Sequence, residues 1–328
     1  MEFVTIPGTD IEASRIALGT WAIGGWMWGG TDEQESIRTI HAALDKGVTT
    51  IDTAPVYGFG RSEEIVGKAL EQYGKRDKIV LSTKVALEWT EDGGVVRNST
   101  PERIEKEIRD SLKRLRTDYI DIYHIHWPDP LVPFEETART MKGLLDEGTI
   151  RAVGVSNYSP EQMDAFRTVC PIMLNQPPYN IFERAIEGDV KPYCRRNDIA
   201  LMTYGALCRG MLSGRMKADR EFTGDDLRRH DPKFQAPRFS SYLGAANALT
   251  KLAGDRYKKA LLPFAVRWVL DQGAEIALWG ARKPEQLDPV GDILGWKMDE
   301  ATMKRVDDIL EREVGDPVDP SFMAPPSR

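Results

Sequence analysis

The stretch Ile51-Asp52-Thr53-Ala54-Pro55-Val56-Tyr57-Gly58 carries a carboxylate at the end of a short apolar run and a phenol just beyond it. Two further runs end in a reactive group: Val80-Leu81-Ser82-Thr83-Lys84 in an ammonium, and Ile122-Tyr123-His124-Ile125-His126 in an imidazole. Such runs are typical of buried strands. Where helices separate parallel strands, polar residues at the strand ends gather at the C-terminal face of a barrel. We therefore expect one site that contains Asp52, Tyr57, Lys84 and His126.

Short apolar runs and helical patterns alternate along the whole chain. The predicted strands are residues 16–18, 48–52, 79–84, 119–126, 150–155, 172–176, 200–204 and 275–279. The predicted helices include residues 33–46, 62–73, 101–115, 133–147, 160–169 and 257–272. Thr100 before Pro101 is a capping signal, and Gly47 and Gly148 stand where left-handed C-caps are expected. The alternation predicts an α/β fold, a closed (β/α)8 TIM barrel, as a single domain over residues 1–328.

An open doubly wound sheet is the competing α/β architecture. A dinucleotide fingerprint after the first strand would favour it, but Leu18-Gly19-Thr20-Trp21-Ala22-Ile23-Gly24-Gly25 lacks the required glycine spacing. Gly58-Phe59-Gly60 is followed by no third glycine. The sequence therefore favours the barrel.

The connection over residues 205–244, after the seventh strand, is far longer than the usual loop of about 4 to 6 residues. It carries several arginines, so it is either a lid that meets phosphate or an ordinary solvated loop. After the eighth strand, an extra helix over residues 299–311 leads to a proline-rich tail, residues 317–328.

Composition limits the kinds of partner. The net charge is −7 and the isoelectric point is near 5.4, with no extended basic segment, which argues against a nucleic-acid partner. Three cysteines without paired spacing argue against a disulfide framework and against a metal site. No signal-peptide pattern and no run near the about 20 apolar residues of a membrane span are present. We expect a cytoplasmic protein with a small-molecule substrate.

Taken in order, the motifs resemble the aldo-keto reductase superfamily over nearly the whole chain. They are Gly19-Thr20-Trp21, Asp52 to Gly58, Ser82-Thr83-Lys84, His126-Trp127-Pro128, Gly154-Val155-Ser156-Asn157, Asn175-Gln176, Tyr204 to Gly210 and Gly280-Ala281-Arg282. Ala17 to Trp26 and Phe322 to Pro326 are similar to the soluble bacterial branch that includes general stress proteins and short-aldehyde reductases. The resemblance implies a barrel with NADPH across its top.

The resemblance also implies a catalytic tetrad of Asp52, Tyr57, Lys84 and His126. Tyr57 would give a proton, and the Lys84 ammonium would lower its pKa from about 10. Asp52 would keep Lys84 charged, and His126 would direct a ring nitrogen at the substrate oxygen. Taken one at a time, these residues also fit a packed tyrosine, a lysine–aspartate pair and a core histidine.

Cofactor contacts follow from the same resemblance. Ser156, Asn157 and Gln176 would meet the nicotinamide carboxamide, with Tyr204 stacked on the ring. The pyrophosphate would lie near Thr20, Trp21 and the backbone of Gly205, Ala206, Leu207, Cys208, Arg209 and Gly210, with Arg215 and Arg228 reaching in from the lid. Asp52 would also belong to the cofactor-binding residues. Arg282, after Gly280 and Ala281, would take a 2′-phosphate, and Gln286 would lie near the adenosine. Pro289-Val290 departs from the Glu-Asn pair that holds the adenine in many relatives.

The leading function is NADPH-dependent reduction of aldehydes, with ketones or dicarbonyls as further substrates. Trp21, Trp89 and Trp127 would line an apolar substrate mouth. Two alternatives stay open at this stage. One is a Schiff-base lyase that uses Lys84, and the other is an NADPH-binding sensor that serves a partner protein. The sequence indicates no oligomeric state.

His124 lies two residues before His126 in the same predicted strand. Residues two apart share a face, so His124 should point to the barrel axis one level below His126 and should be buried. It is either a core histidine with local hydrogen bonds, or a group beneath the tetrad that changes the pH dependence of hydride transfer through Lys84 and Tyr57.

Overall fold

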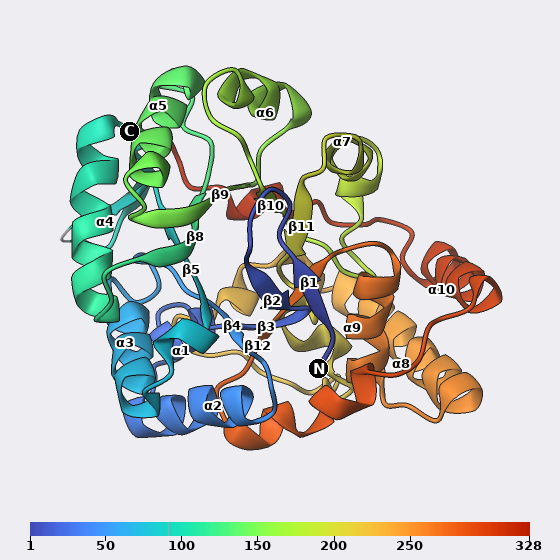
Figure 1. Ribbon diagram of the computed structural model, residues 1–328. Helices are drawn as coiled ribbons and strands as arrows, with labels where there is room; N and C mark the ends of the chain where they lie inside the picture. Colours follow the sequence, from blue (N-terminus) through green and yellow to red (C-terminus); the bar gives the residue numbers. More distant parts are fainter. Residues whose placement is uncertain (91) are drawn as a thin grey trace.

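The chain folds around a closed barrel of parallel strands, and the computed structural model describes residues 1–90 and 92–328 (Figure 1). Neighbouring strands pair in chain order, and the last pairs with the first. The strands are β3 (Ile16–Gly19), β4 (Thr50–Asp52), β5 (Val80–Val85), β8 (Ile120–Ile125), β9 (Ile150–Ser156), β10 (Leu174–Gln176), β11 (Ala200–Thr203) and β12 (Ile276–Gly280). The predicted (β/α)8 barrel is confirmed.

Helices surround the barrel as a ring (Figure 1). They are α2 (Glu33–Asp45), α3 (Arg61–Tyr73), α4 (Pro101–Leu115), α5 (Phe134–Asp146), α6 (Pro160–Arg167), α7 (Val190–Arg196), α8 (Arg238–Tyr257), α9 (Leu261–Asp271) and α10 (Glu300–Glu313). The Thr100 hydroxyl accepts from the Arg103 amide and caps α4, as predicted. Gly47 and Gly148 have positive φ, which glycine adopts without strain. Within the described part of the chain, no helix is both long and apolar enough to cross a membrane.

Two short hairpins and a short helix lie outside the predicted pattern. β1 (Phe3–Thr5) pairs with β2 (Glu12–Ser14), and β6 (Leu87–Trp89) pairs with β7 (Val95–Arg97). Helix α1 covers Trp21–Gly24 directly after β3. Strands this short carry too few alternating residues for a periodicity to be recognised.

The segment after β11 differs most from the prediction. The expected helix over 257–272 is α9, and a further helix, α8, precedes it from Arg238, so the irregular connection ends before residue 244. Half of the buried face of α8 is alanine, which makes its apolar stripe hard to recognise in the sequence. The rest of the connection forms 3-10 turns at Cys208–Ser213, Leu227–Arg229 and Pro232–Phe234. Further 3-10 turns cover Arg76–Lys78, Ala185–Glu187, Pro284–Ile293 and Pro320–Met323.

Two apolar cores hold the fold. One fills the space between the strands and the helices. The other fills the barrel interior, where the β1–β2 hairpin places Ile6, Ile11 and Ala13 against inward residues such as Ile122 and Leu174. The hairpin crosses one open end of the barrel in Figure 1. The opposite end, where the strands terminate, is left for polar side chains.

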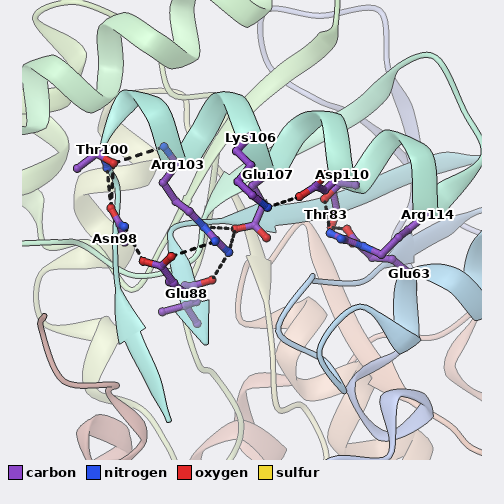
Figure 2. A network of polar contacts seen from close by, with 12 residues as sticks. Glu63, Thr83, Glu88, Asn98, Thr100, Arg103, Lys106, Glu107, Asp110 and Arg114 are labelled. Carbon is purple, nitrogen blue, oxygen red and sulfur yellow. Dashed lines mark hydrogen bonds and ion pairs between the residues drawn. The ribbon is translucent and has the colours of Figure 1, made fainter. Parts of the chain in front are cut away.

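A buried ionic network supports the outside of β5 (Figure 2). The Thr83 hydroxyl, next to Lys84 in sequence, donates to Glu63 at 2.6 Å, and Arg114 donates to the other Glu63 oxygen at 2.7 Å. One turn away, Arg103 pairs with Glu107 at 2.7 Å. Burial raises the pKa of both carboxyls, that of Glu107 to about 7. The strand that carries Lys84 is thus fixed from the helical side.

Close contact between α3 and α4 depends on Gly67. A Cβ at this position would overlap the Arg114 carbonyl oxygen and lie 2.9 Å from Leu115 Cα. We predict that Gly67→Ala destabilises the protein by about 1–3 kcal/mol, because the helices must separate. Gly143→Ala in α5 is the matched control: nothing lies within 4 Å, so the variant should gain about 0.5–1 kcal/mol of helix propensity. Urea unfolding measures both, and a gain in both variants would contradict the packing argument.

Candidate active site

A lysine–aspartate pair lies at the C-terminal end of the barrel strands. Lys84 Nζ, from β5, donates to Asp52 Oδ2 at 2.6 Å and to the Thr53 carbonyl oxygen at 2.9 Å. The other Asp52 oxygen accepts from Ser82 Oγ at 2.8 Å and from Gln176 Nε2 at 3.0 Å. Both charged side chains are almost wholly buried. The ammonium is therefore fixed in place by a carboxylate that is itself held on both oxygens.

Tyr57 stands above this pair, in the loop that follows β4. Its ring stacks on Trp21, with centroids 5.8 Å apart and planes 20° apart, and meets His126 edge-on at 5.8 Å. Lys84 Nζ lies 5.0 Å from the Tyr57 ring centroid. The structure thus brings together Asp52, Tyr57, Lys84 and His126, as the strand ends predicted.

Two glycines allow the Tyr57 loop to pack against the segment after β3. A Cβ at Gly24 would lie 2.6 Å from the Tyr57 carbonyl oxygen, and one at Gly58 would overlap the Gly24 carbonyl oxygen. Gly58 also has a φ of +68°, which disfavours other residues. The backbone around Tyr57 is therefore fixed by contacts that only glycine permits.

The pKa of Tyr57 differs from the sequence-based expectation. Burial and the Asp52 charge raise it well above 10, so the expected lowering by Lys84 is not found. Burial also lowers the pKa of Lys84, against the opposing effect of Asp52. For His126, burial and the nearby Lys84 charge hold the pKa well below 6.5. Tyr57 and His126 are consequently both neutral near pH 7.

A second polar group lies beside the first. Ser156 Oγ donates to the Gln176 carbonyl oxygen at 2.7 Å, and Asn157 Nδ2 donates to the His126 carbonyl oxygen at 3.1 Å. The Tyr204 hydroxyl donates to Asn157 Oδ1 at 2.9 Å. Asn157 adopts a φ of +62°, a conformation that non-glycine residues rarely take. Asn157 also donates to Ser156 Oγ at 3.0 Å, so Gln176, Ser156, Asn157 and Tyr204 form one hydrogen-bonded row along the barrel mouth.

A cavity of about 850 Å³ opens over both groups. Most of the predicted site residues line it: Thr20, Trp21, Asp52, Tyr57, His126, Trp127, Ser156, Asn157, Gln176, Tyr204, Gly205, Ala206, Leu207, Arg209, Gly210, Arg215, Arg228, Gly280, Arg282 and Gln286. Lys84 is buried beneath it. Pro289 also reaches the cavity, whereas Val290 packs in the core.

Besides Lys84, three predicted residues are not among the cavity-lining residues that the structure describes. Cys208 and Ala281 are buried in the core. Trp89 packs against Phe59 and under the Arg103 guanidinium, which turns it away from the cavity. The predicted substrate mouth therefore includes Trp21 and Trp127 without Trp89.

The arginines of the long connection have partners that the sequence did not indicate. Arg209 is almost buried and pairs with Glu183 at 2.9 Å and Asp231 at 3.1 Å, both of which also pair with Lys233. Arg228 is held by Asp226 through two nitrogens. The charges of both arginines are thus already matched by carboxylates. Arg215 is exposed at the rim.

Sequence analysis missed the residues that form the far wall. Val56, Leu87 and Val95 cluster with Tyr57 and Trp127, and the tail adds Phe322 and Pro325. Arg97 holds this tail by donating to the Pro325 carbonyl oxygen at 2.7 Å. The β6–β7 hairpin and the tail are too short and irregular to show a hydrophobic periodicity in the sequence. Their part in the cavity wall is therefore visible only from the contacts in the structure.

The site fits a nicotinamide dinucleotide on geometric grounds. Gly19 and Gly280 end two adjacent strands without side chains, which leaves the groove open at the barrel rim. Arg282 projects into the groove and is bonded to two neutral groups, the carbonyls of Trp28 at 2.8 Å and Gly30 at 2.6 Å. A groove with exposed backbone and a cation whose charge is not cancelled is suited to phosphate.

Comparison with known proteins agrees with this geometry. The model of the Aldo/keto reductase family matches residues 15–311. The chain belongs to the aldo-keto reductase family. Its members are oxidoreductases that act on carbonyl compounds with nicotinamide cofactors.

Individual relatives cover almost the whole chain. Aldo-keto reductase YhdN of Bacillus subtilis is 60% identical over 329 residues, which span 100% of this chain and 99% of the relative. The structure of the glycerol dehydrogenase AKR11B4 from Gluconobacter oxydans is 54% identical, covers 98% of this chain and 99% of its own, and has a TM-score of 0.89. The NADH-specific methylglyoxal reductase of Escherichia coli is 35% identical over 88% of this chain and 91% of the relative. These names differ in substrate, and one of them specifies NADH.

Proposed function

We propose that this aldo-keto reductase uses NADPH to reduce uncharged aldehydes, and ketones or dicarbonyls that fit the same cavity, to alcohols. The observation that carries the proposal is the buried Lys84–Asp52 pair beside the Tyr57 ring, with His126 edge-on to that ring. A neutral phenol and a neutral imidazole then face one cavity above a fixed positive charge. This is the arrangement that protonation of a carbonyl oxygen requires.

Each residue has a distinct task in the proposed reaction. A bound dihydronicotinamide supplies the hydride to the carbonyl carbon. The Tyr57 hydroxyl gives its proton to the oxygen as the negative charge develops there. His126, as a neutral imidazole, donates a ring N–H to the same oxygen and orients the carbonyl. Lys84, held by Asp52, stabilises the phenolate that remains until solvent returns the proton.

The Schiff-base alternative is disfavoured by where Lys84 lies. Its nitrogen is wholly buried, donates to Asp52 and Thr53, and is not part of the described cavity lining. A lysine nucleophile must be neutral and must reach the substrate carbon. Trapping with borohydride in the presence of a carbonyl substrate should therefore leave Lys84 unmodified.

The choice of NADPH rests on Arg282. Its guanidinium has neutral partners and opens onto the cavity, so an added 2′-phosphate would supply the missing negative charge. Gln286 stabilises the same turn, because its side-chain oxygen accepts from the Arg282 amide at 2.7 Å. Ser156, Asn157 and Gln176 form the polar row suited to the carboxamide, and Tyr204 stands beside it to stack on the ring.

The substrate class follows from the surroundings of Tyr57. The apolar cluster around it consists of Ala54, Val56 and Leu87, with Trp26, Val95 and Trp127 packed against them. This cluster brings no charged side chain to the Tyr57 ring. A carboxylate on a short substrate that enters this cluster would lose its hydration without gaining a partner, which costs free energy. Uncharged carbonyl compounds are therefore preferred.

The role of Tyr57 is tested by Tyr57→Phe. Removing the acid should lower the hydride-transfer rate by roughly 10²–10⁴ while the affinity for NADPH stays within about twofold. Stopped-flow absorbance of NADPH at saturating cofactor measures the rate. Retention of more than half of the wild-type rate would exclude Tyr57 as the proton donor.

The cofactor prediction compares Arg282→Ala with Lys283→Ala. Lys283 is adjacent but exposed, and its nearest acid is Glu35 at 3.6 Å. Loss of one charge-assisted hydrogen bond of about 1.5–3 kcal/mol should weaken NADPH binding about 10- to 100-fold in Arg282→Ala and leave NADH binding unchanged. Fluorescence titration gives both dissociation constants. Equal ratios in wild type and Arg282→Ala would remove Arg282 from the phosphate site.

The substrate prediction compares butanal with succinate semialdehyde, which has a carboxylate at the far end of the same four-carbon chain. We expect kcat/KM to be at least about tenfold higher for butanal, which corresponds to about 1.4 kcal/mol of discrimination. Steady-state NADPH absorbance is sufficient. Preference for the acid would mean that a cation outside the apolar cluster receives it.

A further inference from the structure

His124 is a buried imidazole in the barrel interior that the proposed reaction does not use. It lies in β8, two residues before His126, and its side chain is fully buried. The β5–β8 register pairs it with Lys84, so the two side chains enter the barrel from adjacent strands at the same level. The β8–β9 register pairs it on the other side with Gly154.

Gly154 makes room for this ring. A Cβ on Gly154 would overlap His124 Nδ1 and Cε1 and would lie 2.9 Å from Cγ. The imidazole therefore occupies the place of the missing side chain and is confined between β5 and β9. Its position relative to Lys84 is set by the barrel wall.

Neither ring nitrogen of His124 has a hydrogen-bond partner among the described residues. The main chain of Val155 lies near the ring and favours its protonated form, but its geometry does not meet that of a hydrogen bond. A buried polar group without partners costs free energy, and a leucine of similar size would fill the space without that cost. Packing alone therefore does not explain why this position, level with Lys84, holds a histidine rather than a leucine.

The charged groups around His124 come from β5, which is adjacent to β8, and from β4, the next strand beyond β5. Asp52 on β4 favours the imidazolium, while Lys84 on β5 opposes it. His126, directly after β8, is neutral, and the nearby His124 helps to lower its pKa. Gly154 on β9 and Gln176 on β10 bring no charge. Burial dominates and lowers the pKa of His124 to about 4, so the ring is neutral near pH 7.

We propose that His124 is a positioning residue for the reaction: its neutral ring confines Lys84 to Asp52, and its protonation creates a second cation that competes with Lys84 for that carboxylate. Asp52 accepts from Ser82 and Gln176 on one oxygen and from Lys84 on the other, so a second cation would have to share the oxygen that Lys84 uses. When Lys84 is displaced, the phenolate of Tyr57 loses its stabilising charge and hydride transfer slows. The inference rests on the proposed function.

The test uses pH-jump single-turnover kinetics. Wild type, His124→Leu and His124→Gln are loaded with NADPH at pH 7 and mixed with butanal into buffers of pH 3.5 to 8, before acid unfolding can occur. We expect the wild-type rate to fall through a midpoint of about 4, to about a quarter of its plateau at pH 3.5. Neither variant can take up this proton, so both should lose that midpoint, and the fall should begin at lower pH.

Tyr123→Phe is the matched control. Tyr123 directly precedes His124 on β8 and faces the helices. It also has a buried hydroxyl without a partner among the described residues. It should keep the wild-type profile. Nuclear magnetic resonance of the His124 ring in folded wild type, assigned by its loss in His124→Gln, should give a pKa well below 6.5.

Two results would overturn the proposal. The first is a fall of the rate at low pH that has the same midpoint in wild type and in both variants. The second is a His124 ring with a pKa near 6.5 in the folded protein. If His124→Leu does not fold, His124→Gln and the wild-type ring titration still decide the outcome. A wild type that oxidises NADPH with no carbonyl would instead contradict the proposed function.

Discussion

The ion pair between Lys84 and Asp52 is the constraint on which the arrangement of the site depends. Both charges are buried, and leaving either one unpaired would cost about 3–5 kcal/mol. The barrel meets this constraint by bringing two strands to the carboxylate that β4 carries: Lys84 and Ser82 come from β5, and Gln176 comes from β10. Asp52 therefore ties strands from different parts of the barrel wall. Tyr57 and His126 then take their places around a positive charge that Asp52 and the Thr53 carbonyl hold in position.

The sequence was sufficient for the barrel and for the residues at its strand ends. Parallel strands are buried on both faces, so each one is a short apolar run, and the side chain that follows must lie at the rim. Asp52, Lys84 and His126 could be placed in this way. Local pattern could not show that burial would raise the pKa of Tyr57, because that depends on Trp21 and other residues distant in sequence.

Long-range contacts account for most of what the sequence could not show. The tail residue Phe322 lies against Arg209 and Lys233, two cations of a buried cluster that also contains Glu183 and Asp231. These residues come from four separate segments of the chain. No spacing rule brings them together, and the sequence could show only that Arg209 stands beside a predicted phosphate loop.

The cavity arginines differ in whether a carboxylate already neutralises their charge, and an arginine without such a partner is available to a bound anion. Arg209 and Lys233 share Glu183 and Asp231, so two positive charges meet two negative ones. Arg228 is matched by Asp226. Among the described residues, the Arg282 guanidinium is bonded only to carbonyl dipoles of the loop after β3, and these orient it without cancelling its charge. An anion that enters the groove therefore gains more at Arg282 than at Arg209 or Arg228, where it would have to displace a carboxylate already in place.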